Sequence, residues 1–166
     1  MQDRKKIVFC DTGFFIRLVG ETGKLHDSTL AYFKYFLDNR YILRMSTISI
    51  AEFCVKDTIQ HLPLRNIIIS PFNAYSAVYT GGCAEILLKE KSKGARVAND
   101  RVIILNDVKI MAQAQCDKAD YYITSDTKSK RMYDVLKRSG KVTYQFIDIH
   151  DPYDKVFGCL DFKNKA

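Results

Sequence analysis

Hydrophobic residues occur along this chain in two patterns, short continuous runs and longer stretches in which they recur every three or four positions. The short runs predict extended segments at residues 7–10, 41–45, 67–70, 121–124 and 142–147. The longer stretches between them predict helices, and strands that alternate with helices of this length pair in parallel through right-handed crossovers. The pattern therefore predicts an α/β protein, a three-layer α/β/α sandwich with a central, mostly parallel sheet.

Helix boundaries are expected where capping residues or glycine interrupt the pattern. A short helix follows the first strand, and later helices are expected to begin at Asp27 or Ser28, near Ser49, at Asn73, at Asp107, and at Asp126 or Thr127. The helix that begins near Ser49 is expected to run to about Gln60. The helix from Asn73 is expected to run to about Lys91, and a loop follows at 93–100. Its inward-facing residues are predicted to be Ala74, Ala77, Val78, Ala84 and Leu88.

The chain is predicted to be one domain over residues 1–147, followed by an extension at 148–166 of unknown role. Its 166 residues are 47% hydrophobic and 27% charged, a composition that excludes a disordered or low-complexity protein. No apolar run reaches the roughly 18 residues needed to cross a bilayer, and no signal-peptide core is present. The five cysteines are isolated, which favours a reducing cytoplasm over a disulfide scaffold or a structural zinc site.

Four acidic residues stand next to apolar segments where predicted elements meet. Asp11 and Asp126 follow strands, Asp107 opens a helix, and Glu52 lies early in a helix. Because groups beyond the carboxyl ends of parallel strands converge on one crevice, the four are expected to share a pocket. Each alone has a simpler explanation, as a helix cap or a solvent-facing side chain. Together, beside core strands, they favour a paired or metal-bound cluster.

Four carboxylates in one pocket need a cation, since two like charges about 5 Å apart repel by about 3 kcal/mol at an effective dielectric of about 20. With oxygen ligands and no nearby histidine or cysteine pair, the expected ion is Mg²⁺ or Mn²⁺. Such a site suits phosphodiester hydrolysis, because the ion activates a water molecule and neutralises charge building at phosphorus.

The residues around these acids resemble the motifs of the PIN domain family. The motifs are V-F-C-D-T-G-F-F at 8–15, S-x-x-S-I-A-E-F at 46–53, N-D-V-K-I-M-A-Q-A at 106–114 and A-D-Y-Y-I-T-S-D at 119–126. The resemblance implies a metal-dependent endoribonuclease with Asp11, Glu52, Asp107 and Asp126 as catalytic metal ligands. It also implies supporting hydroxyls at Thr12 and Thr124. Lys128, Ser129 and Lys130 depart from the family, which often has a phenylalanine there.

Small single-domain proteins of this family are very often toxins of toxin–antitoxin pairs. The resemblance therefore implies a small antitoxin protein that binds near the site, and a homodimer. RNA as substrate agrees with the charge, because 26 basic residues exceed 19 acidic ones for a net charge of +7. The densest basic stretch, at 128–141, directly follows Asp126, and Lys128, Lys130 and Arg131 are its predicted contacts with the RNA backbone.

The sequence thus predicts a cytoplasmic Mg²⁺- or Mn²⁺-dependent endoribonuclease of toxin type. Two alternatives stay open. One is a nuclease of the same fold that works in RNA processing or on DNA. The other is a non-catalytic RNA- or protein-binding module, in which the acids serve as helix caps.

Overall fold

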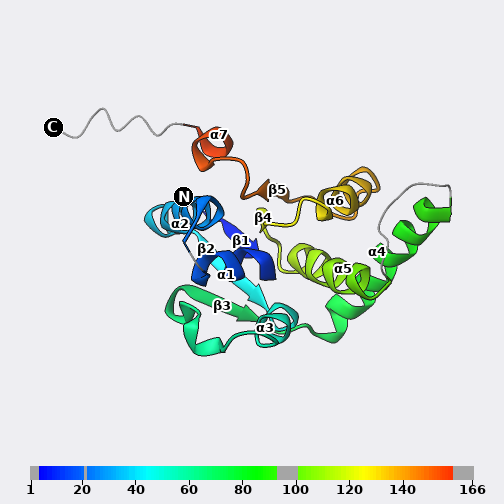
Figure 1. Ribbon diagram of the computed structural model, residues 1–166. Coiled ribbons are helices and arrows are strands. Elements are labelled where there is room, and N and C mark those ends of the chain that lie inside the picture. The colour runs from blue at the N-terminus through cyan, green and yellow to red at the C-terminus, as the bar shows by residue number, and fades with distance from the viewer. Residues whose placement is uncertain (1–3, 21, 93–100, 159–166) are drawn as a thin grey trace.

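The chain folds around a five-stranded sheet in which every strand pairs in parallel, in the order β3-β2-β1-β4-β5 (Figure 1). The computed structural model describes residues 4–20, 22–92 and 101–158. The strands are β1 (Ile7–Cys10), β2 (Ile42–Ser46), β3 (Ile67–Ser70), β4 (Tyr121–Thr124) and β5 (Gln145–Asp148). The predicted parallel sheet is confirmed.

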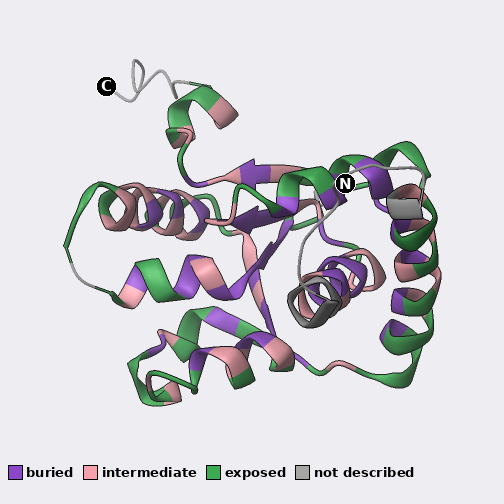
Figure 2. Ribbon diagram, turned by 45° about the vertical axis from the view of Figure 1, so that its right-hand side comes forward, coloured by how far each residue is buried: buried purple, intermediate pink, exposed green. Residues whose placement is uncertain are grey.

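Helices cover both faces of the sheet, so the predicted three layers are also confirmed (Figure 2). On one face α1, α2 and α3 pack against Val8, Cys10 and Ile123. On the other, α4, α5 and α6 pack against Phe9 and Tyr122. The helices are α1 (Thr12–Val19), α2 (Lys24–Asp38), α3 (Thr47–Phe53), α4 (Ala74–Ser92), α5 (Arg101–Cys116), α6 (Ser129–Arg138) and α7 (Tyr153–Phe157), with 3-10 turns at Ile59–His61 and Leu64–Asn66.

The expected boundaries of four helices are wrong. Helix α6 begins at Ser129, after Lys128 at its N-cap, so neither Asp126 nor Thr127 caps it. Helix α2 begins at Lys24, so Asp27 lies in its first turn and does not cap it. Helix α3 ends at Phe53, because the Asp57 carboxylate accepts hydrogen bonds from the Thr58 amide and the His61 ring and forms a local turn instead. Helix α5 already includes the apolar stretch at 102–105, which places Asp107 inside the helix.

The predicted inward face of α4 is wrong at most of its positions: Ala84 packs against the core, but Ala74, Ala77, Val78 and Leu88 are exposed. Asn73 caps this helix as expected, because its side chain accepts a hydrogen bond from the Ser76 amide. Val78 is 78% exposed and Leu88 58% exposed. The buried positions follow a different helical stripe, namely Ser76, Thr80, Cys83 and Leu87. The Thr80 hydroxyl donates to the Ser76 carbonyl at 2.7 Å, so this polar stripe is buried with its hydrogen bonds made.

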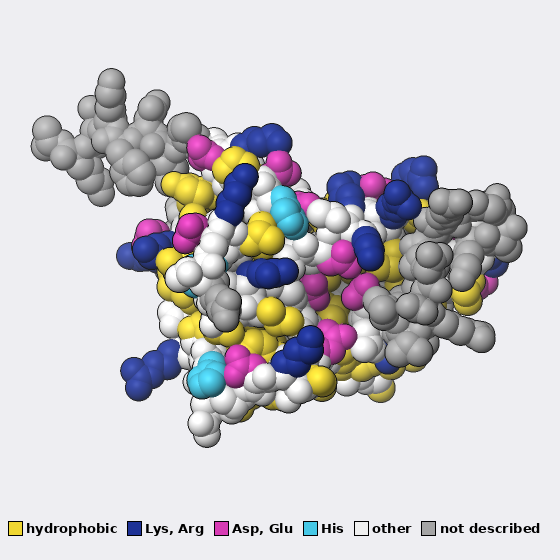
Figure 3. Space-filling view, viewed as in Figure 1, with side chains coloured by type: hydrophobic (Ala, Val, Ile, Leu, Met, Phe, Trp, Pro, Cys, Tyr) yellow, Lys and Arg dark blue, Asp and Glu magenta, His cyan; other side chains and the backbone are white. Residues whose placement is uncertain are grey.

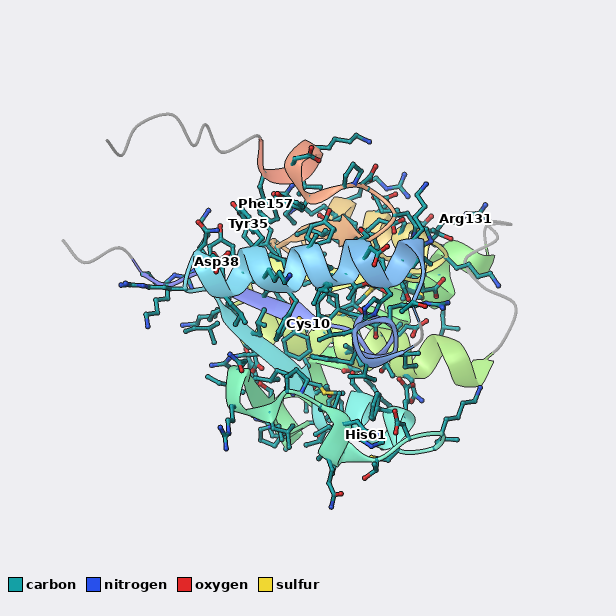
Figure 4. All side chains as sticks on the ribbon, turned by 60° about the vertical axis from the view of Figure 1, so that its left-hand side comes forward. Cys10, Tyr35, Asp38, His61, Arg131 and Phe157 are labelled. Carbon is teal, nitrogen blue, oxygen red and sulfur yellow. The ribbon has the colours of Figure 1, made fainter. Side chains whose placement is uncertain are left out.

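The last strand starts later than predicted, at Gln145. The backbone before it bonds to side chains instead of a neighbouring strand: the Thr143 amide donates to Gln115 Oε1 at 2.8 Å, and the Thr143 and Tyr144 carbonyls accept from Lys137 Nζ. Beyond the strand, α7 packs on α2, and Phe157 stacks on Tyr35 with ring centroids 4.6 Å apart (Figure 4). Residues 149–158 therefore belong to the packed structure.

A buried polar network fixes the carboxyl edge of the sheet where β2 and β3 end. Ser46 Oγ donates to Gln113 Oε1 at 2.6 Å and accepts from the Ile48 amide, which caps α3. Gln113 Nε2 donates to the Ser70 carbonyl at 2.9 Å. The network ties α5 to two strand ends and sets the direction in which α3 leaves the sheet.

None of the described helices is both long enough and apolar enough to cross a membrane. Cys10, Cys54, Cys83 and Cys116 are free thiols, and Cys159 lies outside the described residues.

Candidate active site

Asp11 lies at the centre of the carboxyl edge, where β1 ends between β2 and β4. Its side chain is 7% exposed, and both oxygens accept hydrogen bonds. Oδ1 accepts from the Thr12 amide at 2.7 Å, which caps α1, and Oδ2 accepts from Thr124 Oγ1 at 2.7 Å. The Thr124 hydroxyl also accepts from the Asp126 amide at 2.9 Å. Thr124 therefore links the first acid to the loop that carries the last.

Glu52 reaches the same place from α3. Thr12 Oγ1 donates to Glu52 Oε2 at 2.5 Å, and Asn106 Nδ2 donates to Glu52 Oε1 at 3.0 Å. The carboxylate is thus held between the start of α1 and the second turn of α5. Asn106 was not among the predicted site residues, although it directly precedes Asp107.

Asp107 lies on α5 and is largely buried, yet no described side chain compensates its charge. Its carboxylate accepts no hydrogen bond or ion pair from any side chain that the structure describes. Burial raises the pKa of Asp107 to about 7, and the charges of Asp11, Asp126 and Glu52 add to the shift. Burial likewise raises the pKa of Asp11 to about 6, while its hydrogen bonds with Thr124 and Thr12 oppose the shift. These four carboxylates therefore lie close enough to repel one another.

Asp126 occupies the loop between β4 and α6. Its Oδ1 accepts from the Lys128 amide at 2.8 Å, and its carbonyl accepts from the Ser129 amide and hydroxyl. Capping thus describes part of the role of Asp11, but it describes neither Asp126, which precedes the N-cap of α6, nor Asp107, which lies within a helix.

The comparisons with known proteins identify the fold. No family model and no curated protein matches this sequence. Among solved structures, VapBC2 from Rickettsia felis, bound to a DNA fragment from its promoter, superimposes with a TM-score of 0.58 at 18% identity, covering 86% of this chain and 98% of that one. DNA-bound VapBC from Salmonella typhimurium gives 0.57 at 13%, covering 88% and 99%. VapC20 from Mycobacterium tuberculosis, a toxin that cleaves the sarcin–ricin loop, gives 0.51 at 12%, covering 72% and 90%.

The chain has a VapC-like PIN fold. In this fold the strand order reverses direction at β1, since β2 and β3 lie on one side and β4 and β5 on the other. Open α/β sheets bind ligands at such a switch point, beyond the carboxyl ends of the strands. Asp11 and Asp126, from β1 and the β4–α6 loop, lie at this point of the PIN fold.

The chemistry of the cluster fits a hard divalent cation. All its donors are oxygens, the four carboxylates repel one another, and Asp107 has no hydrogen-bond donor among the described side chains. Within the described ranges, however, no three acidic, histidine or cysteine side chains converge tightly enough to form a ready metal-binding group. The residues thus supply oxygen donors suited to such an ion, but the described side chains are not arranged as a formed metal site.

Gly13 allows the start of α1 to approach the β4–α6 loop of the PIN fold. A Cβ atom at this position would lie 2.3 Å from Ser125 Oγ, a contact that real side chains do not make. The loop carries Asp126, so this approach brings the first and last acids together. In the sequence, the glycine two residues after Asp11 is a sign that the backbone there is closely approached, whereas nothing marks Ser125 as the residue that approaches it.

We expect Gly13→Ala to turn the Ser125 hydroxyl aside, to reduce RNA cleavage about three-fold and to lower the free energy of unfolding by less than about 1 kcal/mol, because the contact is with the end of a rotatable side chain. The double variant Gly13→Ala/Ser125→Ala should recover most of both losses, because it removes the hydroxyl that the new methyl group meets. Thermal unfolding and cleavage rates of the two single variants and the double variant measure this coupling. Additive effects would contradict the close approach.

The predicted RNA-contacting basic residues differ in their surroundings. Lys130 forms an ion pair with Asp134 and lies over the Tyr133 ring, 5.0 Å from its centroid. Lys128 and Arg131 are exposed, and neither has an ion pair among the described residues. Lys and Arg side chains gather over α6, next to a group of acidic side chains (Figure 3). Lys128 and Arg131 are thus freer than Lys130 to meet a ligand.

Proposed function

We propose that this chain is a metal-dependent endoribonuclease and the toxin of a toxin–antitoxin pair. The observation that carries the proposal is Asp107, a carboxylate on α5 that has no described donor and lies among three other acids. A structural role would leave its charge uncompensated, whereas a cation offsets it. The likeness in fold to VapC proteins supports the same function.

The proposed ligands of Mg²⁺ or Mn²⁺ are Asp11, Glu52, Asp107 and Asp126. When bound, the ion lowers the pKa of a water molecule and offsets charge that builds at phosphorus during hydrolysis. The chain's own contribution is to orient the ligands. Thr12 holds Glu52 through its hydroxyl, and Thr124 holds Asp11, so the orientation of both carboxylates is fixed by their neighbours.

RNA is the proposed substrate, and its backbone is held by the basic surface of α6. If four acids are assigned to the metal, 15 acidic residues remain against 26 basic ones across the chain. Lys128 and Arg131 lie directly beyond Asp126 and are exposed, so they are the main proposed phosphate contacts. Lys130 contributes less, because Asp134 already neutralises it.

We further propose an antitoxin protein as the partner, a homodimeric assembly and a cytoplasmic location. VapB–VapC complexes among the proteins of similar fold support an antitoxin. The free cysteines support a reducing compartment.

Cleavage assays test the nuclease directly. Purified protein is incubated with structured RNAs and with single-stranded DNA, in Mn²⁺ or in EDTA, beside an Asp126→Asn variant purified in parallel to reveal contaminating nucleases. We expect RNA to be cut by the wild-type protein in Mn²⁺ alone. Cleavage of DNA in preference to RNA would instead indicate a DNA nuclease. Absence of both cleavage and Mn²⁺ binding would contradict the proposal and favour a binding module.

A further inference from the structure

A hollow of about 410 Å³ opens beside the acid cluster, between α3 and α5. The hollow is shallow and open to solvent, so a ligand here would lie against its walls and would not be enclosed. Its α3 wall is mainly apolar, with Ile48, Ala51 and Val55, and Glu52 lies at the side shared with the acids. Val55 is 78% exposed at its rim.

The α5 wall adds a positive charge. Lys109 is partly buried and lies one helical turn after Asn106. It forms no ion pair with any described carboxylate. Its Nζ donates to Asn106 Oδ1 at 3.4 Å, while Asn106 Nδ2 donates to Glu52 Oε1 at 3.0 Å. The amide of Asn106 is therefore oriented by both neighbours. It separates an ammonium group on one side from the acid cluster on the other.

We propose that this hollow binds the nucleotide next to the scissile phosphate, with Lys109 on that nucleotide's phosphate and the Ile48–Val55 wall against its sugar and base. The inference rests on the proposed nuclease function and names the subsite that continues it. The hollow and the acid cluster share Glu52, so a chain whose phosphate lies at the acids has its next nucleotide within reach of the hollow. One cation beside an apolar wall matches one phosphate beside one base.

A peptide segment is the competing occupant, and the surroundings of Lys109 disfavour it. An acidic side chain would meet Lys109 but would also face Glu52 across Asn106. A phosphodiester at the acids, in contrast, comes with the cation that offsets them. A nucleotide is therefore the ligand whose chemistry suits both the apolar wall and the lysine of the opposite wall.

Binding of a fluorescein-labelled, 2′-O-methylated single-stranded RNA tests the role of Lys109. Anisotropy titrations are made in Ca²⁺, a divalent ion with the same preference for oxygen ligands that offsets the acids, over a range of salt concentrations, and the RNA is checked to be intact after each titration. We expect Lys109→Ala to weaken binding about ten-fold and to lower the slope of log affinity against log salt by about 0.7, the value for one phosphate contact on a single strand. Lys109→Arg should retain most of the affinity, and the matched control Lys34→Ala, an exposed lysine of α2, should change it less than about two-fold.

The apolar wall is tested with a pair of valines of equal exposure. Val55 borders the hollow and Val78 lies on the outer face of α4, and both are 78% exposed. We expect Val55→Asp to weaken RNA binding about ten-fold, since a carboxylate replaces the surface that meets the nucleotide. Val78→Asp adds the same charge elsewhere and should have an effect below about two-fold.

Mn²⁺ titration of the same variants separates this proposal from the function on which it rests. Lys109→Ala should bind Mn²⁺ as the wild-type protein does; weakened Mn²⁺ binding together with an unchanged salt slope would show that Lys109 only supports Glu52, and would overturn the subsite. If the wild-type protein binds RNA and neither Lys109→Ala nor Val55→Asp changes its affinity, the proposed nucleotide subsite is overturned. The proposed nuclease function would be unaffected by this result. A peptide would then be the favoured occupant of the hollow. A wild-type protein that binds no RNA would overturn both proposals.

Discussion

Asp107→Asn is expected to lower the rate of RNA cleavage by at least about a hundred-fold and, at the same time, to make the metal-free protein more stable. Cleavage falls because the substitution removes one proposed metal ligand. Stability rises, by about 1–2 kcal/mol, because the amide removes a charge that burial and three neighbouring carboxylates disfavour. Cleavage rates in Mn²⁺ and thermal unfolding in EDTA at pH 8 measure the two effects.

Asp38→Asn is the matched control, since this aspartate is exposed at the end of α2 and forms no ion pair with any residue that the structure describes. It should change neither cleavage nor stability by a measurable amount. Opposite changes in activity and stability are typical of residues kept for function. If Asp107→Asn instead destabilised the protein, the carboxylate would be serving the fold, and the proposed metal site would lose its main support.

The free energy of unfolding of the metal-free protein should fall as the pH rises from about 4 to about 7. The pKa values of Asp11 and Asp107 are raised to about 6 and about 7 in the folded state, above the ordinary value of 3.8. The folded chain therefore holds more protons than the unfolded chain in this window. The stabilisation is complete below pH 4 and is lost as the pH passes through the folded pKa values, with a change on the order of a few kcal/mol.

Chemical denaturation in EDTA at several pH values measures this trend, and the Asp107→Asn variant isolates the contribution of one group. Its stability should depend less steeply on pH than that of the wild-type protein. Saturating Mn²⁺ at pH 8 should restore about 2–3 kcal/mol, because an ion that binds only the folded state stabilises it. A wild-type curve that matched the variant at every pH would contradict the raised pKa of Asp107.

The order and type of most elements follow from the sequence because burial on both sides of a parallel sheet leaves a plain signal. The runs at Ile7–Cys10 and Tyr121–Thr124 are strands at the predicted positions. Local patterns fail where tertiary contacts decide. The stripe of α4 that faces the core includes Ser76 and Thr80, whose hydroxyls make hydrogen bonds within the core, while apolar Val78 faces outward. Nothing in hydrophobicity alone identifies such a stripe.

The candidate site shows the same division. The structure brings the four predicted acids and both predicted hydroxyls to one edge, since each follows from its place at the end of a strand or on a neighbouring helix. Asn106 and Lys109 could not be found in this way. These two residues are three positions apart, which is an ordinary spacing on a helix. They form one wall of the hollow only because α3 lies opposite them, and the hydrogen bond from Ser46 to Gln113 helps to set the position of α3. The roles assigned to all these residues stay predictions until the variants are measured.

The central position of β1 has a consequence for synthesis on the ribosome. Asp11 is made early, yet the strand that completes its surroundings, β4, is made some 110 residues later, and Asp126 follows it. A growing chain that has produced only β1, β2 and β3 carries two of the four acids and lacks Thr124, the partner of Asp11. Assembly of the site thus waits for contacts between distant parts of the chain. If the proposed function holds, a nascent polypeptide gains nuclease activity only after Thr124 and Asp126 have emerged and packed against the end of β1.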